Sequence, residues 1–282
     1  MKKGLVLEGG GLRGAYTAGV CAWMVQHGID FDVHLGISSG AMFAIGTAMK
    51  DLDLIYGMGV KYSQDKHIIG IESMLKTGRP VNYTYLFEVI LKQKLGLSAT
   101  KIRAIKPLVE YGVYSLDDQK TEFINQSQTD DELLMLKAAT VLPIAGADVK
   151  IGKRLYMDGG VTTMIPIRRA RELGVEKMIV VTTKADNFVR KDNAPLTQFM
   201  LDVLYRNYKR LLREFRERKD VYNGEMAEVK RLAAEGSVLW IHPTKDFGAK
   251  RFKATPEQIQ AMYDLGQADC DTRKDEILNF FK

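Results

Sequence analysis

Residues 4–14 read GLVLEGGGLRG, and residues 32–40 read DVHLGISSG. In each stretch a short apolar run passes directly into glycines, as buried strands do where they enter a turn. The predicted elements are strands over 4–8 and 32–37 and helices over 15–26 and 41–50. A chain that alternates strands and helices in this way is expected to form an α/β domain with a mainly parallel sheet. Its loops then meet at the carboxyl edge of the sheet, where α/β proteins place their sites.

The pattern continues to about residue 185. The further predicted elements are a hairpin over 108–114 and 121–124, a helix over 133–142 behind a capping box at Thr129, a strand over 154–157, a helix over 167–173 and a strand over 177–183. The apolar stretch 83–91 leaves two interpretations open, a wall or lid of a binding pocket and ordinary core. We therefore predict a first domain over residues 1–185.

Residues 186–282 differ in character and are predicted to form a mainly helical extension packed on that domain. A long helix over 199–219 has an apolar face and a basic face that includes Arg218. That basic face suits either solvent, which we favour, or peripheral contact with an anionic membrane. A strand over 237–241 follows, and a capping box at Thr255 opens a C-terminal helix.

Composition limits the class of protein. The 282 residues are 46% hydrophobic and 27% charged, which is enough for a large folded core. The net charge of +6 favours anionic partners, but no groove pattern indicates nucleic acid. The two cysteines form no metal or disulfide pattern, which fits a cytoplasmic protein. The apolar run at residues 4–7 is too short for a signal peptide, so we expect membrane contact to be peripheral.

Residues 36–40, GISSG, match the Gly-x-Ser-x-Gly nucleophile elbow. Gly36 and Gly40 lie two residues either side of Ser38, so the spacing selects Ser38 as nucleophile and leaves the Ser39 N–H as an oxyanion donor. A serine that merely caps the next helix fits the same five residues equally well. The elbow therefore needs support from other motifs.

The glycine loop Gly9, Gly10, Gly11, Leu12, Arg13 and Gly14 also matches the Gly-x-Gly-x-x-Gly dinucleotide fingerprint. That fingerprint expects an acidic residue after the second strand, whereas this strand ends in Ile37-Ser38. Consecutive glycine N–H groups at a helix start also form an anion nest that can hold an oxyanion. Because an elbow follows the second strand, we favour the oxyanion interpretation over NAD binding.

A serine nucleophile needs a proton acceptor. None of the four histidines has a catalytic sequence context. Asp158 follows a strand directly and precedes Gly159 and Gly160, which let the backbone bring the carboxylate close to another group. An aspartate in an ordinary turn would look the same.

Together, the glycine loop, the elbow and Asp158-Gly159-Gly160 resemble the patatin-like phospholipases over residues 4–183. Residues 208–222 and 262–266 resemble the C-terminal extension of a bacterial subgroup of that family. Glu8 departs from the serine, glycine or aspartate that often precedes the loop. The resemblance implies a three-layer α/β/α fold and lipid acyl hydrolysis by a Ser38–Asp158 dyad without histidine.

In that family the amides corresponding to Gly10, Gly11 and Leu12 form the oxyanion hole. No metal or other cofactor is implied, and the substrate would be a lipid or another ester. A catalytically silent binder with the same fold is the alternative.

Overall fold

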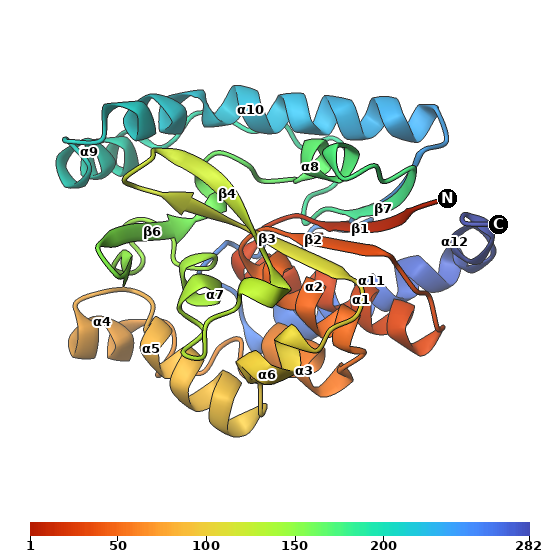
Figure 1. Cartoon of the computed structure of the whole chain (residues 1–282), viewed down its shortest axis with the longest axis horizontal. Coiled ribbons are helices and arrows are strands. Elements are labelled where there is room, and N and C mark those ends of the chain that lie inside the picture. Colours follow the sequence, from red (N-terminus) through yellow and green to blue (C-terminus); the bar gives the residue numbers. More distant parts are fainter.

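The computed structural model describes all 282 residues and has one eight-stranded sheet between two helical layers (Figure 1). The strands are β1 (Lys3–Leu7), β2 (Val33–Gly36), β3 (Leu108–Ser115), β4 (Lys120–Asn125), β5 (Val149–Ile151), β6 (Arg154–Asp158), β7 (Lys177–Val181) and β8 (Val238–Ile241). The strand order is β5-β6-β3-β2-β1-β7-β8, and β4 pairs with β3. The five adjacent strands β3, β2, β1, β7 and β8 run parallel to one another. The other three strands pair antiparallel, β4 and β6 with β3 and β5 with β6. The predicted mainly parallel sheet is confirmed.

Alternating side chains of the central strands pack into two separate hydrophobic cores, one on each face of the sheet. In β1, Leu5 and Leu7 pack against α1 (Gly14–Gln26), α2 (Ser39–Met49) and α11 (Pro256–Thr272). Val6 faces the opposite way, towards α8 (Ile167–Glu172) and α10 (Lys209–Ala234). Figure 1 shows α10 above the sheet, and α1 and α2 below it. The predicted three-layer α/β/α fold is confirmed.

Smaller helices connect these layers. They are α3 (Leu52–Tyr56), α4 (Ile71–Thr77), α5 (Tyr83–Tyr85), α6 (Ala99–Arg103), α7 (Leu134–Ala138), α9 (Pro195–Leu204) and α12 (Lys274–Asn279). A π-helical segment, Leu86–Lys94, continues α5. None of the helices combines the length and the apolar character needed to cross a membrane.

The C-terminal residues contribute to the central layers of the fold. Strand β8 extends the sheet beside β7. Helix α11 packs closely on α1, because Cβ atoms at Gly19 and Gly266 would lie 2.0 Å from the Tyr263 carbonyl oxygen and 2.4 Å from the Tyr16 carbonyl oxygen. The helical C-terminal extension is confirmed, while the boundary at residue 185 stays a prediction.

The single helix expected over 199–219 is wrong. Helix α9 ends at Leu204 and α10 begins at Lys209, because Tyr205 turns into the core and donates a hydrogen bond to Asp148 Oδ1 at 2.9 Å. Arg218, predicted to lie on the basic solvated face, is only 7% exposed. The C-terminal capping box is confirmed, with Thr255 accepting from the Gln258 N–H.

The capping box expected at Thr129 is also wrong. The helix is shorter than predicted and spans Leu134–Ala138. The Asp130 carboxylate satisfies its first amides, accepting hydrogen bonds from the Leu134 and Met135 N–H groups at 2.7 and 2.9 Å. An ionised carboxylate outcompetes a hydroxyl for backbone donors, which explains why aspartate and not Thr129 caps this end.

Candidate active site

Ser38 occupies a sharp turn between β2 and α2. Its backbone is held at φ 57° and ψ −125°, a conformation that non-glycine residues seldom adopt. A Cβ at Gly36 would lie 2.2 Å from the Gly40 carbonyl oxygen, and a Cβ at Gly40 would lie 2.6 Å from the Leu7 carbonyl oxygen. Both glycines are therefore required by the turn. The Ser38 side chain makes no capping hydrogen bond, so the interpretation as a capping serine is wrong.

Asp158 ends β6 and is fully buried. Its Oδ1 accepts a hydrogen bond from the Gly160 N–H at 2.7 Å, whereas its Oδ2 is buried without any hydrogen-bond partner. Burial raises the pKa of Asp158 to about 6, and the nearby Ser38 hydroxyl and Gly160 N–H counteract part of that rise. The fold thus brings Ser38 and Asp158 together and leaves one carboxylate oxygen free to accept a proton.

Backbone contacts fix the loop that carries Asp158. A Cβ at Gly159 would lie 2.6 Å from the Gly112 carbonyl carbon in β3, and a Cβ at Gly160 would lie 2.9 Å from Asp158 Oδ1. The Asp158 N–H donates to the Val141 carbonyl at 2.9 Å. The glycines predicted to free the backbone here do permit close approach.

Arg218, which sequence reasoning did not assign to the site, also holds this loop. It projects from α10, is buried, and donates from Nε to the Gly160 carbonyl at 2.9 Å. Its positive charge also lowers the pKa of Asp158. Arg218 forms no ion pair with a carboxylate, so its principal contact is the Asp158 loop. The sequence predicted that Arg218 lies in a helix, but its position relative to the other basic residues indicated the solvent-facing side of that helix.

The glycine loop contacts the elbow directly. A Cβ at Gly9 would lie 2.9 Å from the Ser38 Cβ, and a Cβ at Gly14 would lie 3.0 Å from Ser39 Oγ. The Gly10 N–H donates a hydrogen bond to Ser39 Oγ at 3.0 Å. The loop therefore lies against the serines, as an oxyanion role requires, but the Gly10 amide is already engaged.

The two other amides of the predicted oxyanion hole differ from each other. The Leu12 N–H donates to the Arg251 carbonyl at 3.0 Å. The Gly11 N–H has no partner within the protein, and Gly11 adopts a positive φ of 58°. The Ser39 N–H, at the start of α2, is also free. In this conformation the available donors are the amides of Gly11 and Ser39.

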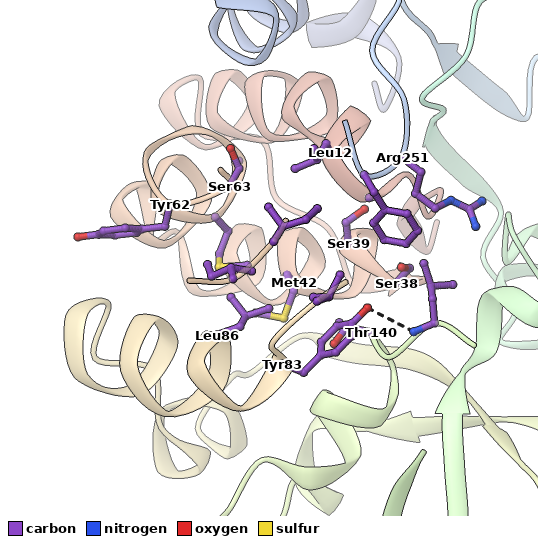
Figure 2. A pocket seen from close by; sticks show the side chains of 18 of the residues that line it. Leu12, Ser38, Ser39, Met42, Tyr62, Ser63, Tyr83, Leu86, Thr140 and Arg251 are labelled. Atoms are coloured by element: carbon purple, nitrogen blue, oxygen red, sulfur yellow. Dashed lines mark hydrogen bonds between the residues drawn. The ribbon is translucent and has the colours of Figure 1, made fainter. Parts of the chain in front are cut away.

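Ser38 lies in the wall of a narrow cavity of about 130 Å³ (Figure 2). Fourteen of the 21 lining residues are hydrophobic, which makes the cavity suited to an alkyl chain. Met42, Tyr83 and Leu86 lie around it in Figure 2, and the Leu142 N–H donates to the Tyr83 hydroxyl at 3.3 Å. Both interpretations of residues 83–91 are confirmed in part, because Tyr83, Leu86 and Phe87 line the cavity. Ile90 and Leu91 are buried in the core.

No histidine lines this cavity. His34 is buried within β2, and burial lowers its pKa to about 4. His27 stacks on Trp23, and His242 packs beside Trp240. His67 pairs with Glu72 at 2.6 Å. The titratable side chain next to Ser38 is the carboxylate of Asp158.

Comparison with known proteins identifies the family of the chain. A family model described as patatin-like phospholipase matches residues 5–171. The chain belongs to the patatin-like phospholipase family. The matched range contains the glycine loop, Ser38 and Asp158, whereas Arg218 and Arg251 fall in residues 208–282, which match a domain of unknown function, DUF6363.

Two individual proteins resemble this patatin-like chain. The uncharacterized protein YjjU of Escherichia coli (strain K12) is 23% identical over 184 residues, covering 64% of this chain and 51% of that protein. The chain thus spans about half the length of this curated relative. The crystal structure of VipD from Legionella pneumophila aligns with 98% of this chain and 67% of its own chain, at a TM-score of 0.47 and 13% identity.

Proposed function

We propose that this protein is a serine acyl hydrolase that cleaves carboxylic esters of lipids, with Ser38 as nucleophile and Asp158 as general base. The observation that carries the proposal is the unpartnered Oδ2 of Asp158, buried beside Ser38 at an apolar cavity. A buried carboxylate oxygen without a hydrogen-bond partner lowers the stability of the fold, and such groups are typical of functional sites. Family membership supports ester hydrolysis as the reaction.

In the first half-reaction, Ser38 Oγ attacks the ester carbonyl carbon while Asp158 Oδ2 accepts the hydroxyl proton. The carbonyl oxygen becomes an oxyanion, which receives hydrogen bonds from the Gly11 and Ser39 amides. When the tetrahedral intermediate collapses, the bond to the leaving alcohol breaks and Asp158 returns its proton to that alcohol. The product is an acyl ester on Ser38, with the acyl chain in the apolar cavity.

In the second half-reaction, water attacks the acyl ester and gives its proton to Asp158. The new tetrahedral intermediate expels Ser38 Oγ, which takes the proton back, and the fatty acid leaves. Both steps need the ionised form of Asp158. Because burial raises its pKa to about 6, the rate should rise with pH through about 6 and level off above it.

A panel of phospholipids, lysolipids and short-chain esters tests the proposal. The wild type should hydrolyse at least one class, and Ser38→Ala should lose that activity while keeping the same thermal unfolding profile. Ser63→Ala is a matched control, because Ser63 lines the same cavity but donates its hydroxyl to the Val60 carbonyl. A protein that binds these lipids without cleaving any of them would support the silent binder instead.

Peripheral membrane contact belongs to the same proposal. Helix α9 exposes Leu196 and Phe199 at 70% and 64%, and α4 exposes Ile71 and Leu75 at 81% each. A groove lined by Pro80, Met200 and Phe252 borders α9. Exposed apolar residues beside a lipid site are typical of interfacial contact.

Sedimentation with liposomes measures this contact. The wild type should sediment with phosphatidylglycerol vesicles, and Leu196→Ser combined with Phe199→Ser should reduce the bound fraction several-fold. Equal sedimentation of the wild type and this variant would exclude α9 as the contact surface.

A further inference from the structure

A second cavity, of about 850 Å³, is lined by cationic side chains. They are Arg13, Lys184, Arg190, Lys191, Lys245 and Arg251. These residues come from the loops that follow β1, β7 and β8, which are neighbours in the parallel part of the sheet. Three carboxyl-edge loops thus converge on one basic cavity. Arg251 also lines the cavity that contains Ser38.

The inner cations of this cavity have no partners within the protein. Arg13, Lys184, Arg190 and Arg251 are half-buried, yet none forms an ion pair and none donates a side-chain hydrogen bond. The Nε of Arg13 is fully buried without any acceptor. A partly buried guanidinium normally has a carboxylate partner, as Arg169 has in Glu110 at 2.7 Å.

Aromatic rings hold several of these side chains in place. The Lys184 Nζ lies 4.7 Å from the centre of the Phe188 ring, and the Arg190 guanidinium lies 5.8 Å from that of Tyr222. Lys245 Nζ lies 5.1 Å from the centre of the Phe247 ring. Rings orient cations without neutralising them. The N–H groups of these side chains therefore keep fixed orientations but have no hydrogen-bond acceptor.

Three carboxylates lie near these cations, and each already accepts other hydrogen bonds. Glu225, which lies near Arg190, accepts from the Met164 and Ile165 N–H groups at 3.1 and 3.0 Å. Glu8 is buried, and its Oε2 accepts from the Thr183 hydroxyl at 3.0 Å. Asp246 lies at the exposed rim and accepts from the Gly248 N–H at 2.8 Å. Burial and the charge of Arg13 lower the pKa of Lys184 to about 8, and the charge of Glu8 offsets only part of that shift.

We infer that this cavity is a binding site for a phosphorylated ligand. A phosphoryl group carries up to two negative charges and several acceptor oxygens, so it can engage two guanidinium groups and an ammonium group at once. The volume exceeds that of a phosphate ion and falls within the range of small-molecule sites, so the ligand carries an organic part as well. The inference goes beyond the proposed hydrolysis and does not require Ser38 to be catalytic.

Calorimetric titration with inorganic pyrophosphate at constant ionic strength tests the site. The wild type should bind, and its unfolding temperature should rise with pyrophosphate concentration. Lys184→Gln combined with Arg190→Gln should weaken binding at least about tenfold, because hydrogen bonds between charged groups are lost. The same variant without ligand should unfold at a higher temperature than the wild type, because mutual repulsion is relieved.

The matched control removes two positive charges elsewhere. Arg206 and Arg213 are exposed and form no ion pair, so Arg206→Gln combined with Arg213→Gln should leave pyrophosphate affinity unchanged. Lys245→Gln changes only the exposed rim and should weaken binding several-fold in a folded protein. Absence of pyrophosphate binding to the wild type, or equal loss of affinity in the control and cavity variants, would overturn the inference.

Two further ligands identify the source of the phosphoryl group. Dihexanoyl phosphatidic acid, below its micelle concentration, carries the phosphate on a lipid, and dihexanoylglycerol is the same lipid without it. A phosphorylated lipid as the ligand predicts that phosphatidic acid binds the Ser38→Ala protein more tightly than pyrophosphate does. A soluble phosphorylated ligand predicts the reverse order. Equal binding of the two lipids, with Lys184 and Arg190 making no difference, would contradict a phosphoryl site.

Discussion

The two loops that carry the proposed dyad are held in different ways. The elbow around Ser38 is held within the N-terminal part of the chain, because Gly36 approaches Gly40 and Gly40 approaches the Leu7 carbonyl at the end of β1. The Asp158 loop depends on distant residues, namely Gly112 in β3 and Arg218 in α10. The position of the nucleophile therefore depends on the first two strands and the turns that follow them, whereas the position of the base also depends on β3 and on the C-terminal helix α10.

Among the variants that test this difference between the two loops, Asp158→Asn should have the largest effect on kcat. Losing a general base costs about 10²–10⁴-fold in rate, and kcat on any substrate identified should fall by that amount. The amide oxygen can still accept from the Gly160 N–H, so the fold should persist. Unchanged kcat in this variant would show that another group accepts the proton.

The same variant should be more stable than the wild type at neutral pH. Burial raises the pKa of Asp158 from 3.8 to about 6, so folding disfavours the ionised form. Stability from this group is full below pH 3.8 and is lost as pH rises to about 6. At about 1.4 kcal/mol per pKa unit, the gain for Asp158→Asn is about 3 kcal/mol above that window. Denaturant unfolding at pH 4 and pH 7.5 measures it, and an equal difference at both values would contradict the shift.

Gly36→Ala should disrupt the elbow through backbone sterics. The new Cβ would lie 2.2 Å from the Gly40 carbonyl oxygen, so the backbone of the turn would have to shift. We expect a loss of at least about 3 kcal/mol in the free energy of unfolding. Gly224→Ala in α10 is the control, because a Cβ there meets nothing within 4 Å, and it should stabilise the protein by about 0.5–1 kcal/mol. Similar values for the two variants would show that the elbow is not tightly constrained.

Arg218→Met tests whether the base depends on the distant helix. It removes the hydrogen bond to the Gly160 carbonyl and a positive charge that favours ionised Asp158. We expect kcat to fall about 10–100-fold, as for other residues that orient a catalytic group, with KM nearly unchanged. The pH midpoint of kcat should move upward, because the pKa of Asp158 rises. Arg213→Met on the exposed face should change neither quantity, and a lower kcat without a shifted midpoint would assign Arg218 a purely structural role.

The smallest expected effect is a difference in unfolding free energy that reports backbone strain at Ser38. Its positive φ of 57° is disfavoured for any residue with a Cβ. Ser38→Gly should therefore be more stable than Ser38→Ala by about 1–2 kcal/mol, although both should be inactive. Equal unfolding free energies for these two variants would mean that the elbow conformation is unstrained.

The difference between the loops also explains what could be predicted from sequence. The strands and helices flanking the elbow follow from apolar runs and glycines that are close in sequence, and residues 4–50 fold as expected. The break between α9 and α10 could not be predicted, because it depends on Tyr205 reaching Asp148, 57 residues away. Helical spacing placed Arg218 on the solvated face, and only the tertiary contact with Gly160 shows its role.

The oxyanion loop shows the same limit. The glycines identify a nest, but the sequence does not reveal that Ser39 Oγ and the Arg251 carbonyl engage the amides of Gly10 and Leu12. The cation-lined cavity could not be predicted from the sequence either. Its residues are spread from Arg13 to Arg251 and come together only in the folded protein, where β1, β7 and β8 end.

The most direct test of the central claim is labelling with a fluorophosphonate, followed by peptide mass spectrometry and a rate measurement. The Ser38–Asp158 dyad predicts that the wild type is labelled on Ser38, that Ser38→Ala is not labelled, and that Asp158→Asn reacts at least about 10²-fold more slowly. Labelling of Ser39 or Ser63, or an unchanged rate in Asp158→Asn, would contradict it.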